Sequence, residues 1–238
     1  MKRFLTFIAF AATLTIASCG DDPTTPASAP AKEPVVVSAA ASLKTAFTAY
    51  GTAFDAGDVR LSFAGSDVLA AQIRQGARPD VFAAANTKLP QELYAEGLVE
   101  APTVFAGNRL VLAVPKDSKI DGLQDVEASG TKVAIGSQSV PVGAYTRKIL
   151  SKLPDPQADA ILGNVRSEEP DVKGIIGKLT QGAVDAGFVY ITDVTAAGDD
   201  LRAVELPASL EPSAAYGVAV VKGTKNPAGA QAFVDGLI

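Results

Sequence analysis

The chain has 238 residues, with 21 Lys and Arg residues against 26 Asp and Glu residues, so its formal net charge is −5. It contains no histidine and a single cysteine, Cys19, which excludes Ser–His and Cys–His catalysis, His-based zinc sites and a disulfide within one chain. The negative charge, without a basic stripe, argues against a nucleic-acid partner.

Residues 1–19 are predicted to be a lipoprotein signal peptide. Lys2 and Arg3 supply a positive start, and residues 4–17 are almost continuously apolar. This stretch is too short to cross a bilayer comfortably, and it ends in small residues as secretory signals do. Its end, Ile16-Ala17-Ser18-Cys19, resembles a bacterial lipoprotein processing site. We therefore expect Cys19 to be the lipidated first residue of a mature, membrane-anchored chain.

Residues 20–33 are expected to form a disordered tether between that anchor and the rest of the protein. They are rich in proline, threonine, serine and alanine and have no large apolar side chain. Such a segment cannot bury a core. The remaining residues, 34–238, are enough for one large α/β domain or for two smaller lobes.

Strand and helix patterns alternate through residues 34–238, which predicts an α/β fold with a parallel or mixed sheet. The strand candidates are residues 35–39, 59–63, 81–84, 110–114, 132–135, 165–167, 186–190, 202–206 and 216–221. Apolar residues at helical spacing lie between them, in residues 43–50, 69–73, 89–94, 141–150 and 172–179. Asn226-Pro227 predicts the start of a last helix, because asparagine is a common N-cap and proline a common first helical residue.

Five corners at strand and helix ends carry groups that suit a small anion. A strand-to-helix corner collects unpaired backbone N–H groups and the positive end of a helix dipole, and the carboxyl ends of strands gather at one edge of an α/β sheet. The corners hold Ser42, Ser66, Val142, Val172 and Tyr190. Each residue also has an ordinary interpretation, the serines as N-caps, the valines as packing residues and the tyrosine as an amphipathic strand end.

The order of these corners and the residues in them resemble one family, the periplasmic molybdate-binding proteins of ABC importers. The resemblance spans about residues 35–233. The segments that carry it include Ala39-Ala40-Ala41-Ser42-Leu43, Phe63-Ala64-Gly65-Ser66, Pro79-Asp80-Val81-Phe82, Asn108-Arg109-Leu110-Val111-Leu112, Val140-Pro141-Val142-Gly143 and Gly187-Phe188-Val189-Tyr190.

The resemblance implies a two-lobed periplasmic-binding-protein fold, in which each lobe is a mixed, mostly parallel sheet flanked by helices. Residues 34–110 and 216–238 would form the first lobe, and residues 111–215 the second. Two strand crossovers, near residues 110–115 and 214–217, would form the hinge about which the lobes close on the ligand.

The resemblance also implies the roles of the five corner residues. Ser42 and Ser66 would each give a hydroxyl and a backbone N–H, Val142 and Val172 would give backbone N–H groups, and Tyr190 would give its phenolic O–H. Molybdenum would be held through its oxygens, so no side chain is a metal ligand and no cofactor is implied. Such an all-donor pocket suits molybdate, tungstate or sulfate, which are fully ionised, and leaves the proton of phosphate unpaired.

Two residues depart from the family's pattern. Gly65 stands where serine is common, which removes one possible hydroxyl. Asp67 follows Ser66 where a neutral residue is common. Because acidic residues are favourable in the first turn of a helix, we expect Asp67 to lie there and to face solvent.

The implied function is that of an extracytoplasmic, lipid-anchored binding protein and not of an enzyme. It would capture molybdate or tungstate as a monomer and deliver it to the permease of an ABC importer. Two alternatives stay open. One is a receptor for sulfate or phosphate, since cavity size cannot be read from the sequence. The other is a surface-anchored hydrolase that uses a serine and a lysine.

Overall fold

The computed structural model describes residues 33–238. The predicted signal peptide, the lipidated Cys19 and nearly all of the predicted tether lie outside these residues. The helices are η1 (Ala41–Leu43), α1 (Lys44–Ala53), α2 (Ser66–Arg74), α3 (Lys88–Ala95), α4 (Leu123–Glu127), α5 (Pro141–Leu150), α6 (Asp155–Gly163), α7 (Val172–Thr180), α8 (Ile191–Ala197), η2 (Gly198–Asp200), η3 (Ala208–Leu210) and α9 (Pro227–Asp235). None of these helices has the length and apolar character needed to span a bilayer.

The strands form one mixed sheet. They are β1 (Val35–Ala40), β2 (Val59–Ala64), β3 (Val81–Ala84), β4 (Thr103–Pro115), β5 (Val133–Gly136), β6 (Val165–Glu169), β7 (Ala186–Tyr190), β8 (Leu201–Val204) and β9 (Ser213–Val220). Their order is β2-β1-β3-β9-β4-β7-β5-β6, with β8 paired to β4. Every pair that includes β4 or β9 is antiparallel, and the other pairs are parallel.

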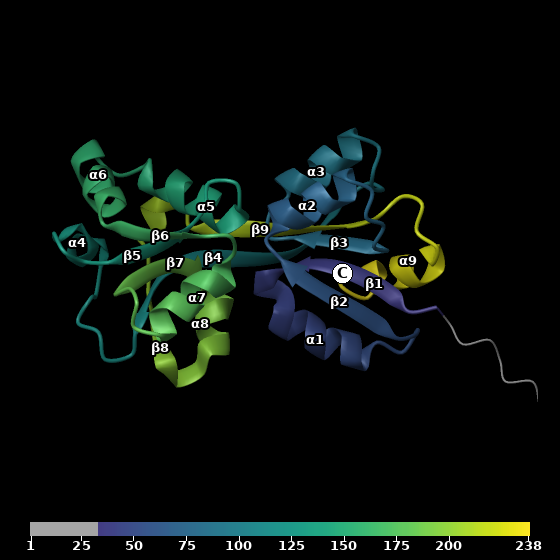
Figure 1. Ribbon diagram of the computed structural model, residues 1–238, viewed down its shortest axis with the longest axis horizontal. Coiled ribbons are helices and arrows are strands. Elements are labelled where there is room, and N and C mark those ends of the chain that lie inside the picture. The colour runs from purple at the N-terminus through teal and green to yellow at the C-terminus, as the bar shows by residue number, and fades with distance from the viewer. Residues whose placement is uncertain (1–32) are drawn as a thin grey trace, which may run out of the picture. The chain divides into compact units, whose positions relative to one another are not determined.

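Two groups of elements share this sheet (Figure 1). The β1 group consists of β1, β2 and β3 with helices α1, α2, α3 and α9 packed on them. The β5 group consists of β5, β6, β7 and β8 with helices α4 to α8. Strands β4 and β9 connect the groups. They pair with each other over residues 103–109 and 213–218, β9 continues beside β3, and β4 continues beside β7 and β8.

The burial of each strand explains the apolar pattern by which its sequence could be recognised. Strands β3, β5 and β7 are buried at every residue and are short continuous apolar runs, as central strands covered on both faces are. The edge strands β2 and β6 alternate between half-buried and exposed residues, as one-sided strands do. The predicted ranges 81–84 and 186–190 coincide with β3 and β7.

The largest difference from the predicted elements lies in β4. The prediction began this strand at Leu110, whereas the strand begins at Thr103. Its first half is half-buried or exposed and forms no apolar run, so the sequence pattern did not reveal it. Its partner β9 also begins earlier than predicted, at Ser213. Helices α4, α6 and α8 were not predicted, since α4 is short, α6 buries only Ile161 and α8 follows β7 without a loop.

Local capping explains two helix starts. The Asn226 side chain accepts a hydrogen bond from the Gly229 N–H, with Pro227 at the first helical position, so the predicted start of the last helix is confirmed. The Asp171 carboxylate accepts from the N–H groups of Lys173 and Gly174 and so caps α7. These caps fix where the helix N-termini lie, and the N-terminus of α7 borders the candidate site.

Candidate functional site

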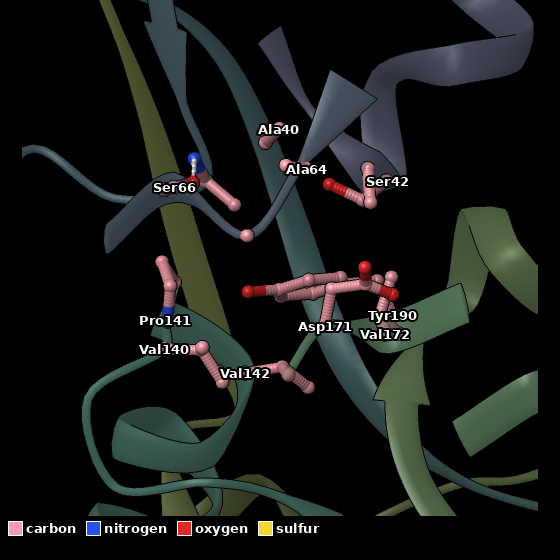
Figure 2. A pocket seen from close by; sticks show the side chains of 13 residues that line it. Ala40, Ser42, Ala64, Ser66, Val140, Pro141, Val142, Asp171, Val172 and Tyr190 are labelled. Atoms are coloured by element: carbon pink, nitrogen blue, oxygen red, sulfur yellow. Dashed lines mark hydrogen bonds between the residues drawn. The ribbon is translucent and has the colours of Figure 1, made fainter. Parts of the chain in front are cut away.

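All five sequence-predicted site residues line one small cavity between the β1 group and the β5 group (Figure 2). Its volume is about 20 Å³. Its lining residues are Ala40, Ala41, Ser42, Ala64, Gly65, Ser66, Ala85, Val140, Pro141, Val142, Asp171, Val172 and Tyr190. The carboxyl ends of β1, β2 and β7 and the starts of α2, α5 and α7 therefore meet at this point.

The β1-group wall of the cavity carries the two serines. Neither serine side chain caps a helix: the N-cap of η1 is Ala40 and that of α2 is Gly65, so the N-cap interpretation is wrong for both. The Ser66 hydroxyl oxygen accepts a hydrogen bond from the Ala85 N–H at 3.1 Å. The Ser42 oxygen accepts one from the Tyr216 hydroxyl at 3.0 Å. Each serine therefore keeps its own hydrogen for another acceptor.

The opposite wall, from the β5 group, presents helix N-termini. Val172 is the first residue of α7, and Val142 is the second residue of α5 after Pro141. Helix geometry leaves the first backbone N–H groups without an intrahelical acceptor, and Pro141 has no N–H to offer. Both valine side chains are buried. They pack into the core, while their N–H groups belong to the positive end of a helix dipole.

Tyr190 reaches the cavity from the end of β7. It is 1% exposed, and its hydroxyl is buried without a hydrogen-bond partner among the described residues. Figure 2 shows this hydroxyl pointing into the space between Ser66 and Val142. Burial raises the pKa of Tyr190 well above its ordinary value, so the phenol keeps its proton. A buried hydroxyl without a partner is uncommon in folded proteins, and here it faces a cavity as a ready donor.

Sequence reasoning missed Asp171, the only charged side chain among the described residues that line the cavity. Its Oδ1 accepts hydrogen bonds from the Lys173 N–H at 2.8 Å and the Gly174 N–H at 3.1 Å. The carboxylate therefore provides an acceptor for two N–H groups of α7. The Val172 N–H, which precedes them, is the first donor of that helix. Its position as an N-cap beside Val172 was the signal that would have found it.

Asp67 and Gly65 lie where the two walls come closest. Contrary to the expectation that Asp67 faces solvent, its Oδ1 is buried and has no hydrogen-bond partner among the described residues. A Cβ atom on Gly65 would lie 2.8 Å from this oxygen and 2.5 Å from the carbonyl oxygen of Pro170, in the β5 group. Glycine therefore stands at this position because the opposite wall leaves no room for a side chain.

A buried ion pair supports the β5-group wall. The Lys173 Nζ lies 2.8 Å from Oδ1 of Asp193, which is 1% exposed. This pair joins α7, which begins at Val172, to α8, which follows Tyr190. Burial raises the pKa of Asp193, and the Lys173 ammonium opposes that rise. The lysine is thus held by a carboxylate instead of lining the cavity.

The arrangement can bind a small anion. Its polar groups are hydroxyls, backbone N–H groups and the Asp171 carboxylate, and none of the described residues that line it is a lysine or an arginine. Among residues 33–238, no three His, Cys, Asp or Glu side chains are grouped as a metal ion would require. The donors are neutral and fixed by strand and helix ends, as in other anion sites at helix N-termini.

Comparisons with known proteins agree with this geometry. The chain is 37% identical over 231 residues to the molybdate-binding protein ModA of Mycobacterium bovis, covering 92% of this chain and 85% of that protein. It is 30% identical to a putative ABC transporter substrate-binding lipoprotein, YvgL, of Bacillus subtilis, covering 99% and 93% of the two chains. Its fold matches the periplasmic molybdate-binding protein of Azotobacter vinelandii with a TM-score of 0.75 at 20% identity, covering 85% and 92%.

These likenesses agree with a family model that covers nearly all of the described residues. Residues 35–238 match the model for bacterial extracellular solute-binding proteins. The chain belongs to the bacterial extracellular solute-binding protein family.

Proposed function

We propose that this protein captures molybdate, and tungstate in the same way, and delivers it to an ABC importer. The observation that carries the proposal is the cavity lined by hydroxyl and backbone N–H donors, in which the Tyr190 hydroxyl is buried and has no hydrogen-bond partner among the described residues. Molybdate-binding relatives of 37% identity support the choice of ion. The ligand is bound and released without chemical change, so the protein acts as a receptor and not as an enzyme.

The donor set explains why a fully ionised tetrahedral anion fits best. Ser42, Ser66 and Tyr190 offer hydroxyl hydrogens, and Val142 and Val172 offer backbone N–H groups. Molybdate and tungstate accept from all of them. Phosphate carries a proton near pH 7, and a buried donor without an acceptor costs roughly 1–3 kcal/mol. The Asp171 carboxylate, which lines the cavity, accepts two backbone hydrogen bonds through its Oδ1.

The cavity volume restricts the ligand further. A cavity needs roughly 10–15 Å³ to hold one water, whereas pockets for drug-sized ligands have roughly 300–1,000 Å³. At about 20 Å³, this cavity is far smaller than those pockets, which favours a compact ion over a sugar, an amino acid or a peptide.

Residues 34–110 with 216–238, and residues 111–215, are proposed to be two lobes that close on the ion. The long antiparallel pairing of β4 with β9 supports this division, since these two strands connect the β1 group to the β5 group. The tight approach of Gly65 to the Pro170 carbonyl supports a closed arrangement in which the walls meet. Closure would be the signal that a membrane permease reads.

The protein is further proposed to be a monomer that a lipid on Cys19 anchors outside the cytoplasm. The support is the processing-site sequence that ends in Cys19 and the similarity to a relative described as a lipoprotein. The partner is then the permease of an ABC importer in the same membrane.

A thermal-shift titration tests the ligand. A ligand that binds only the folded state raises the midpoint of unfolding with its concentration. We expect molybdate and tungstate to stabilise the protein, with sulfate and phosphate far weaker. Sulfate binding as tight as molybdate binding would replace the proposal with a sulfate receptor. Ester or peptide turnover that is lost in Ser42→Ala would replace it with a hydrolase.

A further inference from the structure

A chain of hydrogen bonds leads from the backbone of β4 to the cavity serine of η1. The Arg109 N–H donates to Oδ1 of Asn108 at 2.9 Å. The Asn108 Nδ2 donates to the Tyr216 hydroxyl at 3.2 Å and to Oγ1 of Thr192 at 2.9 Å. The Tyr216 hydroxyl donates to Oγ of Ser42 at 3.0 Å. We call the sequence Asn108–Tyr216–Ser42 the relay.

The proton positions in the relay follow from its first bond. A backbone N–H can only donate, so the atom of Asn108 that it contacts is the amide oxygen, and the other atom is the NH₂ group. That NH₂ group in turn can only donate, so the Tyr216 oxygen accepts from it. Tyr216 is 1% exposed, and burial raises its pKa, so it keeps its single hydrogen and gives it to Ser42.

We propose that Asn108 and Tyr216 are specificity-determining positioning residues, which direct the Tyr216 hydrogen onto the Ser42 oxygen and so leave the Ser42 hydrogen to donate into the cavity. The inference rests on the proposed function, in that the cavity is taken as the anion site. The Tyr216 hydrogen occupies one lone pair of Ser42, so the Ser42 hydrogen stays available to the ligand. The relay thereby favours anions that only accept hydrogen bonds over hydrogen phosphate, which must also donate one.

Ser66 shows what is particular about the relay. Its oxygen accepts from a backbone N–H, that of Ala85, so the direction of this hydrogen bond is fixed by the fold and no side-chain substitution at Ala85 reverses it. The oxygen of Ser42 is instead occupied by a side-chain hydroxyl, whose direction depends on Asn108. Of the two cavity serines, therefore, only Ser42 has a hydrogen bond whose direction a substitution at a neighbouring side chain can reverse.

The surroundings of the relay allow such a change without repacking. Asn108 and Tyr216 border a second cavity of about 660 Å³, which Ser42 also borders and which Tyr190 does not line. Asn108 is half-buried at the strand β4. The Tyr216 ring packs against the Tyr190 ring at a centroid distance of 5.6 Å, so removing only its hydroxyl leaves that contact in place.

The decisive variant is Asn108→Asp. A carboxylate still accepts from the Arg109 N–H, but it must also accept from Tyr216. The Tyr216 oxygen then accepts from Ser42, and Ser42 turns its lone pair toward the ligand. We expect the ratio of the phosphate Kd to the Kd of a fully ionised anion to fall about tenfold or more. In the variant, the unfavourable pairing with Ser42 falls on the fully ionised anion instead of on phosphate.

Asn86→Asp is the matched control for the added negative charge. Asn86 follows the cavity residue Ala85, and its Oδ1 accepts from the Leu89 N–H at 3.0 Å, which an aspartate preserves. This variant adds the same charge near the cavity and leaves the relay intact. We expect it to weaken all anions in parallel, without a change in their ratio.

The measurement is calorimetric titration of the wild type and both variants with molybdate, sulfate and phosphate at one pH. The ratio uses whichever fully ionised anion the wild type binds more tightly, so a wild type that prefers sulfate contradicts the proposed function and still tests the relay. A ratio that is the same in Asn108→Asp and Asn86→Asp overturns the relay. Should Asn108→Asp fail to fold, Tyr216→Phe replaces it, because it frees Ser42 to rotate, and an unchanged ratio there overturns the relay equally.

Discussion

The two walls of the cavity hold their donors in opposite ways. On the β1-group wall, both serine oxygens already accept hydrogen bonds from the protein, from the Ala85 N–H and from the Tyr216 hydroxyl. On the β5-group wall, the Tyr190 hydroxyl is buried and has no partner among the described residues. The first wall is therefore preorganised by the fold, whereas the second is satisfied only when an acceptor enters the cavity.

The comparison of the two walls predicts that the largest loss of stability follows from breaking the pair of Lys173 with Asp193, which supports the β5-group wall. In Lys173→Met the Asp193 carboxylate loses its partner. Removing one member of a buried pair costs roughly 3–5 kcal/mol, and the partial exposure of Lys173 places this cost near the lower value. Urea unfolding at pH 7 measures it.

The pH dependence of that variant has a defined sign. Burial already raises the pKa of Asp193 in the folded state, so the protonated carboxyl favours folding, and this contribution is lost as the pH rises through the folded-state pKa. Without Lys173 the pKa rises further. Lys173→Met should thus lose more stability at pH 7 than at pH 4.5, and Asp193→Asn in addition should restore most of it. Equal losses at both pH values would contradict this account.

Gly65→Ala tests the contact between the walls. Its Cβ would lie 2.5 Å from the Pro170 carbonyl oxygen, so the walls must separate. Forcing extra volume into a packed position costs roughly 1–3 kcal/mol, and we expect anion affinity to fall about tenfold to a hundredfold. Gly177→Ala is the control, because a Cβ there meets no atom within 4 Å. Affinity equal to that of the control would show that the walls do not need this approach.

Tyr190→Phe separates binding from stability on the β5-group wall. The variant removes a hydroxyl that has no hydrogen-bond partner among the described residues, so the free energy of unfolding without added anion should stay unchanged or rise. Hydrogen bonds to charged groups contribute roughly 1.5–3 kcal/mol, and we expect a loss of anion affinity of about tenfold to a hundredfold. Calorimetry and urea unfolding measure the two effects, with the exposed Tyr94→Phe as control. Lower stability with unchanged affinity would place the tyrosine in the core only.

The smallest effect on binding is expected at Val142. The ligand contact proposed there is the backbone N–H, which Val142→Ala keeps, so anion affinity should change by less than about twofold. The truncated side chain is buried, and its loss should lower the free energy of unfolding by about 1–2 kcal/mol. An affinity loss as large as that of Tyr190→Phe would mean that the side chain itself shapes the site.

The alternating strand and helix patterns predicted the α/β fold, and the resemblance to the molybdate-binding family implied the five residues that line one cavity. The sequence did not predict the long β4 strand, whose first half lacks an apolar pattern. Nor did it predict the buried Oδ1 of Asp67, or the relay through Asn108 and Tyr216. Each of these depends on a contact between segments distant in the chain, which no local pattern records.

Backbone donors at Val142 and Val172 have a consequence for how this site diverges over evolutionary time. Codons for these residues are free to drift among small and medium apolar side chains while the N–H groups stay in place, since only proline removes them. A ranking of positions by side-chain identity would therefore overlook two of the five proposed ligand-binding residues. In relatives that bind a different ligand, we instead expect substitutions at Asn108 and Tyr216, where a single change alters which anions the cavity binds.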